Sequence, residues 1–149
     1  MITKILVPTD GSKPAKKSVE YAAELARQIG ATITLVSVVD KSSFIPQSIP
    51  SVATPTHIVE PLENFLRRAA EAYIKEAEKI CKNYEIPSDA VIRSGHPVEE
   101  IIKEAIKSKV DLIVIGSQGK SALKAAVLGS VTFGIINKET NIPVLVVRK

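Results

Sequence analysis

The stretch "VDLIVIGSQGKSALKAAVLGSVTFGII", residues 110–136, joins an apolar run to a segment rich in glycine and hydroxyl side chains. Its residues 111–115, DLIVI, show the near-continuous apolar pattern of a strand that is buried on both faces of a parallel sheet. Residues 130–138, which follow the glycine segment, are expected to form a helix. A buried strand, a glycine turn and a helix in this order indicate an α/β fold.

The rest of the chain repeats this alternation of strands and helices. β-branched and apolar runs predict strands, and residues at a 3.6-residue period predict helices. The expected strands are 3–8, 32–39, 88–94, 111–115 and 143–147, and the expected helices are 13–29, 61–83, one opening at 95–106 and 130–138. We therefore predict a single domain, residues 1–149, with an open five-stranded parallel sheet in the order 3-2-1-4-5 and helices on both faces.

Residues 41–59 interrupt the pattern. They contain three prolines and many Ser and Thr residues, so we expect a long irregular loop that covers part of a site or a partner surface. In the helix that follows, apolar residues keep the period of an amphipathic helix: Leu62, Phe65, Leu66, Ala69, Tyr73, Ala77 and Ile80.

The composition is that of an ordinary globular protein, with 45% hydrophobic and 24% charged residues in 149. The net charge of +4 favours a phosphate-bearing partner. However, the basic residues are scattered along the chain, and the chain contains only six Phe and Tyr residues, so nucleic-acid binding is not expected. No apolar run is long enough to span a membrane and the first ten residues do not resemble a signal peptide. With Cys81 as the one cysteine, these features favour a cytoplasmic protein.

Two unusual turns are expected to face one crevice. "VPTDGS" follows the first strand and "VIGSQGKS" follows the fourth, and these strands are neighbours in the order 3-2-1-4-5. The winding direction reverses between them, and ligands of such sheets bind beyond the carboxyl ends of the strands at that point.

The glycine segment suits a phosphate. Glycines let backbone N–H groups approach an anion closely, and a valine at Gly119 would fill that space and disfavour a positive φ. Gly129-Ser130 opens a helix whose N-terminal N–H groups favour negative charge, and Lys120, Ser121 and Ser130 add donors.

Two familiar phosphate-binding motifs do not fit. The Walker A loop needs four residues between its first glycine and Gly-Lys, whereas Gly116 and Gly119 are separated by two. The G-x-G-x-x-G fingerprint is also missing after the first strand. What remains is G-x-x-G, nine residues, and then Gly-Ser.

This pattern resembles the signature of the nucleotide-binding universal stress proteins, G-2x-G-9x-G-[S/T], which Gly116, Gly119, Gly129 and Ser130 match at every position. "KILVPTDGS", "GHPVEEII" and "PVLVV" resemble further elements of that family, so the resemblance covers the whole chain. The chain departs from the family at Gln118, often a basic residue in relatives, and at Phe133, often polar.

The resemblance implies a site for ATP, with Mg²⁺ or Mn²⁺ bridging phosphates near Asp10. Val38 at the end of the second strand would meet the adenine, and Asp10 would lie near the ribose and the metal. It also implies a homodimer formed through residues 143–147, an apolar sheet edge that invites pairing. The implied nucleotide-binding residues are Pro8, Thr9, Asp10, Val38, Gly116, Ser117, Gln118, Gly119, Lys120, Ser121, Gly129, Ser130 and Val131.

Other interpretations stay open. Asp10 also fits a structural role in a turn with Gly11 and Ser12. His57 and His96 have no metal-like or catalytic partner at useful spacing, and no nucleophile–base set can be assembled, so we do not expect an enzyme. Besides an ATP-binding stress-response or signalling module, the candidates are an interaction protein with an empty site and a nucleotide-dependent transferase.

Overall fold

The computed structural model describes residues 1–40, 42, 56–119 and 128–148, with the side chains of residues 56–60 excepted. Within these residues, the five strands form one parallel sheet in the order β3-β2-β1-β4-β5, which confirms the predicted topology. The elements are β1 (Lys4–Pro8), α1 (Lys13–Ile29), β2 (Thr32–Val39), α2 (Thr56–Asn83), β3 (Ser88–Ser94), α3 (Pro97–Lys107), β4 (Leu112–Gly116), α4 (Ser130–Ile136) and β5 (Val144–Val147).

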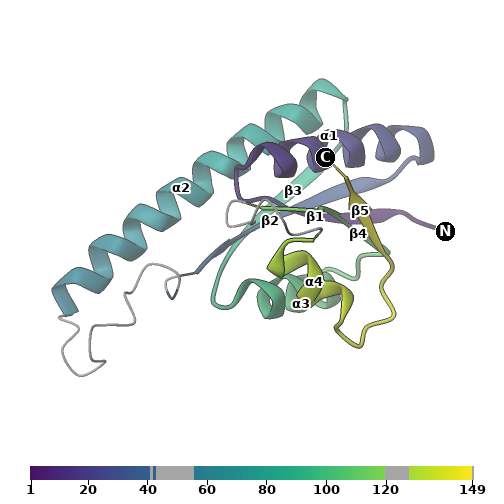
Figure 1. Cartoon of the computed structure of the whole chain (residues 1–149). Coiled ribbons are helices and arrows are strands. Elements are labelled where there is room, and N and C mark those ends of the chain that lie inside the picture. The colour runs from purple at the N-terminus through teal and green to yellow at the C-terminus, as the bar shows by residue number, and fades with distance from the viewer. Residues whose placement is uncertain (41, 43–55, 120–127, 149) are drawn as a thin grey trace.

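The sheet has helices on both faces: α1 and α2 cover one, and α3 and α4 cover the other (Figure 1). Alternate side chains of the central strand β1 serve the two layers, since Ile5 and Val7 pack toward α1 and α2 whereas Leu6 packs toward α3. All five residues of β4 are buried, which confirms the prediction from its apolar run.

Local sequence determines the ends of α1. The Ser12 side chain caps the helix by accepting a hydrogen bond from the Ala15 N–H, and a proline lies in the first turn. Gly30 adopts the left-handed conformation with φ of 75° and donates to the Ala26 carbonyl. Both predicted ends are confirmed.

The start of α2 corrects the prediction. The helix begins at Thr56 rather than near residue 61, and Pro61 lies inside it, so residues 56–59 are not part of a loop. Proline is favoured in a first turn, which suggested a later start, whereas here it lies in the helix interior, where it removes one helical hydrogen bond and its ring crowds the preceding turn. The rest of the predicted loop, residues 41 and 43–55, lies outside the described residues.

The predicted apolar face of α2 is only partly covered. The first turns of α2 extend beyond the sheet (Figure 1), and Phe65 there is 66% exposed. Burial begins at Ala70 and continues through Ile74, Ala77 and Cys81. The periodic pattern therefore runs farther along the helix than the sheet does.

The C-terminal part of the fold is shorter than expected. Helix α4 ends at Ile136 rather than residue 138, and its seven residues form a weaker dipole than a longer helix would. Strand β5 begins at Val144 rather than Pro143 and lies at one edge of the sheet. Within the parts of the chain that the structure describes, no helix is both long and apolar enough to cross a membrane.

Candidate functional site

A cleft of about 700 Å³ opens where the strands β1, β2 and β4 end. It lies at the predicted reversal of the winding direction, and it is also walled by the first turns of α3 and α4. Most of the residues implied by the family resemblance line it: Pro8, Thr9, Asp10, Val38, Gly116, Gln118, Gly119, Gly129, Ser130 and Val131.

Ser117 is the described member of the predicted set that does not line the cleft. It is buried, its N–H donates to the Val147 carbonyl at 2.8 Å, and its carbonyl accepts from the Gly129 N–H at 2.6 Å. Ser117 thus joins β4 to β5 and holds the two parts of the glycine signature together. Lys120 and Ser121 lie outside the described residues.

The turn after β1 places Asp10 in the cleft while using it as a turn residue. Asp10 Oδ1 accepts the Ser12 N–H at 2.9 Å, and Thr9 Oγ1 accepts the Gly11 N–H at 3.3 Å. The Thr9 N–H donates to the Val36 carbonyl at 2.9 Å, which ties the turn to β2. Asp10 therefore has a structural role in the turn and also lines the cleft, so the two interpretations of this residue are compatible.

Close approach of the chain to itself explains the signature glycines. A Cβ at Gly116 would lie 3.0 Å from the Pro14 carbonyl oxygen, and one at Gly129 would lie 3.3 Å from the Gln118 Cα. At Gly119 it would lie 2.7 Å from Asp10 Oδ2.

One expectation about these glycines is wrong, and one of their N–H groups is already bonded within the chain. Gly119 does not have a positive φ; Gly11, Gly30 and Gly95 are the described glycines that do. The Gly129 N–H is bonded to the Ser117 carbonyl, so Gly129 shapes the cleft rather than offering its own N–H to an anion. Thr132 Oγ1 also donates to the Gly116 carbonyl at 2.8 Å, which anchors α4 on β4.

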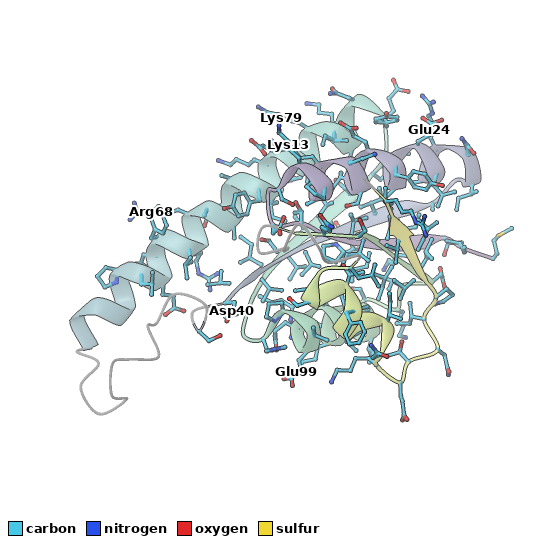
Figure 2. All side chains as sticks on the ribbon, viewed as in Figure 1. Lys13, Glu24, Asp40, Arg68, Lys79 and Glu99 are labelled. Carbon is cyan, nitrogen blue, oxygen red and sulfur yellow. The ribbon has the colours of Figure 1, made fainter. Side chains whose placement is uncertain are left out.

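On the opposite side of the cleft, sequence reasoning predicted Val38 but missed the other residues. This side is lined by apolar side chains from β2 and α3, among them Val36, Val98 and Ile101. Asp40, at the end of β2 (Figure 2), and His96, before α3, also line it. Asp40 follows the carboxyl end of β2 and His96 follows that of β3, which is the same position in the topology that indicated Asp10.

His96 stands at the N-cap of α3 without making a capping hydrogen bond through its side chain. Its position in the cleft is therefore not explained by helix capping. The first turn of α3 contains Glu99 and Glu100, whereas the first turn of α4 has no acidic residue. The glycine side of the cleft is thus the side more favourable to an anion.

A metal in this cleft would need ligands beyond the protein side chains described. Among the described residues, no group of three or more His, Cys, Asp and Glu side chains is placed to hold an ion. Asp10 is the acidic side chain beside the glycine segment. A divalent ion there fits only if phosphate oxygens supply further ligands, which is how Mg²⁺ is commonly bound.

A second hollow, of about 760 Å³, lies at the other edge of the sheet, between the end of α2 and the start of β3. Its lysines 75, 79 and 82 are accompanied by Glu78 and Glu85, so most of the charge is offset. It lies away from the carboxyl ends of the strands, where ligands bind in this class of fold.

Comparison with known proteins gives one consistent result. The model of the Universal stress protein family matches residues 1–148. Universal stress protein MJ0577 of Methanocaldococcus jannaschii is 36% identical over 157 residues, covering 100% of this chain and 96% of its own length. Its solved structure superposes with a TM-score of 0.84 at 33% identity, covering 100% of this chain and 97% of that one.

Two further solved structures share the fold. A universal stress protein in complex with cAMP has a TM-score of 0.70 at 23% identity, covering 98% and 97% of the two chains. The universal stress protein of Archaeoglobus fulgidus in complex with dAMP has a TM-score of 0.65 at 22% identity, covering 98% of each chain.

Proposed function

The chain belongs to the universal stress protein family, and from that premise we propose that it binds ATP in the cleft at the carboxyl edge of its sheet. Mg²⁺ or Mn²⁺ would accompany the nucleotide, with Asp10 as the protein side chain that would help to hold it, and would neutralise phosphate charge. The protein acts as a stress-response or signalling module with little or no turnover.

One observation supports the proposal most strongly. The glycines of the signature, Gly116, Gly119 and Gly129, meet Asp10 in a single cleft although they are more than a hundred residues apart in sequence. Two proteins of the same fold are known with adenine nucleotides, cAMP and dAMP. A cleft that combines a glycine-lined wall with an apolar wall suits a ligand with a phosphate end and an aromatic end.

The charges around the cleft suggest how the nucleotide lies. Its phosphates occupy the glycine side, where the chain can approach closely and α4 begins without an acidic residue. Its base occupies the side lined by Val36, Val38 and Ile101, where Asp40 disfavours phosphate.

The same lining argues for slow turnover. Fast phosphoryl transfer uses cationic side chains to stabilise the transferred group. The described part of the lining contains neither lysine nor arginine, and Gln118 on the glycine side is neutral. A bound metal ion would neutralise phosphate charge, while backbone groups and Asp10 hold and orient the ligand.

Mass spectrometry of small molecules released by denaturing the purified protein tests this function. We expect an adenine nucleotide in amounts that approach one per chain. If no nucleotide is released and millimolar ATP with magnesium gives no thermal shift, the interaction-protein interpretation replaces this one. Rapid release of phosphate by the purified protein would instead favour an enzyme.

We also propose that two copies pair through β5. The strand lies at the edge of the sheet, and its backbone groups alternate in direction. The Pro143 and Val147 carbonyls accept hydrogen bonds from Ile113 and Ser117 on the β4 side. The backbone groups of Val144 and Val146 therefore face outward, where a second copy related by a two-fold axis can pair with them.

A further inference from the structure

Tyr73 of α2 fills the space beside Gly11 in the turn that follows β1. An ideal Cβ at Gly11 would lie 2.2 Å from Tyr73 Cδ1 and 2.4 Å from Cε1, distances that no real side chain tolerates. Gly11 also has a φ of +76°, in the left-handed region that favours glycine. The turn and the aromatic ring are therefore matched to each other.

The position of the ring is determined by the packing of α2. Ala70, Ile74 and Ala77, on the turns before and after Tyr73, are buried against the core. Three residues after Tyr73, Glu76 forms an ion pair of 3.2 Å with Lys16 of α1. The ring thus belongs to a helix segment that cannot easily shift away from the turn.

Asp10 lies on the other side of the same turn. Its Oδ1 accepts the Ser12 N–H, and its Oδ2 lies 2.7 Å from the position that a Cβ of Gly119 would take. The contacts therefore run without a break from Tyr73 through Gly11 and Asp10 to the glycine segment. Tyr73 does not line the cleft itself.

We propose that Tyr73 is a positioning residue for Asp10. Glycine has the widest conformational range of any residue, so the ring adds a steric limit to the turn that the hydrogen bonds at Thr9 and Asp10 already hold. The ring blocks the space into which the turn would relax and keeps the carboxylate against Gly119. The inference rests on the proposed function in one respect, namely that Asp10 helps to hold a metal ion bound to the phosphates.

The first test compares ATP affinity with magnesium and with chelator. In Tyr73→Ala, we expect the gain in affinity that magnesium provides to fall roughly tenfold, as in Asp10→Asn. Tyr73→Phe keeps the ring and should keep the gain. The double variant Tyr73→Ala/Asp10→Asn should lose no more than Asp10→Asn alone, because both act through one carboxylate.

Phe65→Ala is the matched control, because Phe65 is an exposed aromatic residue on the same helix. It should bind ATP as the wild type does, with and without magnesium. Tyr73→Leu covers the case in which Tyr73→Ala fails to fold, since leucine keeps apolar packing without the ring. If the folded ring-less variants keep the wild-type gain from magnesium, the proposal is overturned.

The second test needs no nucleotide and separates this inference from the proposed function. Hydrogen exchange at the Gly11 and Ser12 amides should be roughly tenfold faster in Tyr73→Ala or Tyr73→Leu than in the wild type, Tyr73→Phe and Phe65→Ala. If the wild type binds no ATP, the proposed function fails and this exchange alone decides the role of the ring. Unchanged exchange in the folded variants refutes it.

Discussion

At the scale of one residue, Gly119 shows why this position has no side chain. Its backbone does not need the left-handed region, so the reason lies in space: a Cβ would meet Asp10 Oδ2 at 2.7 Å. That atom is the end of a side chain, not backbone, so the carboxylate rather than the fold gives way when a Cβ is forced against it. A larger residue is therefore tolerated by the fold but displaces the carboxylate from the cleft.

Replacing Gly119 with valine should weaken ATP binding by roughly a hundredfold or more, because several charge-assisted hydrogen bonds to phosphate are lost together. Stability should change by no more than about 1 kcal/mol. Calorimetry and thermal unfolding of the variant measure both. Wild-type affinity in this variant would show that the glycine segment does not hold the phosphates.

Gly30→Ala is the matched glycine control. Gly30 has a φ of 75° but nothing within 4 Å of an added Cβ, and it lies at the end of α1 away from the cleft. We expect a loss of about 1 kcal/mol in stability from the left-handed backbone. Its ATP affinity should not change, which separates strain from lost binding.

Cys81 provides a test of core packing. Burial raises the pKa of the Cys81 thiol to about 11, from an ordinary value of 9.0, although a hydrogen bond with Ser88 opposes the rise. Between these pH values the thiol ionises in the unfolded chain first. Its contribution to stability is therefore complete below pH 9 and is lost as the pH rises toward 11.

We expect the wild type to lose about 2 kcal/mol more than Cys81→Ala between pH 9 and 11. Denaturant unfolding at several pH values measures the difference, and the alanine variant removes the contribution of other titrating groups. Parallel curves for the two proteins would mean that the thiol is not shielded from water.

At the scale of elements, a cluster of charges attaches α3 to the edge strand β3. Arg93 donates to Glu100 and Glu104 at 3.0 Å each, and Ser108 donates to Glu104 as well. Glu104 is only 3% exposed, so its carboxylate depends on these partners. The hydrogen bond with Arg93, followed by that with Lys103, lowers the pKa of Glu100.

Arg93→Met should destabilise the protein by about 3 kcal/mol, because it leaves Glu104 buried without its cation. This corresponds to a fall of roughly 10 °C in Tm. Glu99→Ala is the matched control: Glu99 is exposed on the same helix (Figure 2), and its loss should cost less than about 0.5 kcal/mol. A shift in Arg93→Met as small as that of the control would contradict the account.

The helices also show how far local rules extend. Ser12 and Gly30 define α1 through hydrogen bonds that depend on neighbouring residues, so its ends were predicted from sequence. The start of α2 was not, because Pro61 is compatible both with a first turn and with an interior position. Whether Phe65 is buried depends on how far the sheet extends along α2, and the local sequence pattern does not contain this information.

At the scale of the whole molecule, the topology assembles the candidate site. The strand order could be predicted, and it brings the turn at Asp10 beside the glycines. The same order places Asp40 and His96 at that edge. Asp40 belongs to no recognisable motif and His96 is a variable position of "GHPVEEII", so their entry into the cleft could not be predicted from the sequence pattern. The contact of Tyr73 with Gly11 likewise joins two segments that no sequence motif or spacing connects.

Whole-molecule pairing can be tested without disturbing the core. Leu145 and Val147 pack with α1 and β4, so charges there would unfold the protein. Val146→Pro instead removes an outward N–H that the β4 ladder does not use. We expect it to convert a dimer into monomers in light scattering, whereas Val146→Ala, which keeps the N–H, should remain a dimer. A monomeric wild type, or a dimeric proline variant, would contradict pairing through β5.

The central claim is that the cleft binds ATP with a divalent cation. Titration calorimetry of the wild-type protein with ATP, in magnesium and then in chelator, tests it most directly. Saturable binding of one nucleotide per chain is expected, and it should be weaker without magnesium because Asp10 then faces the phosphates unscreened. An absence of heat at millimolar ATP in both conditions would contradict it.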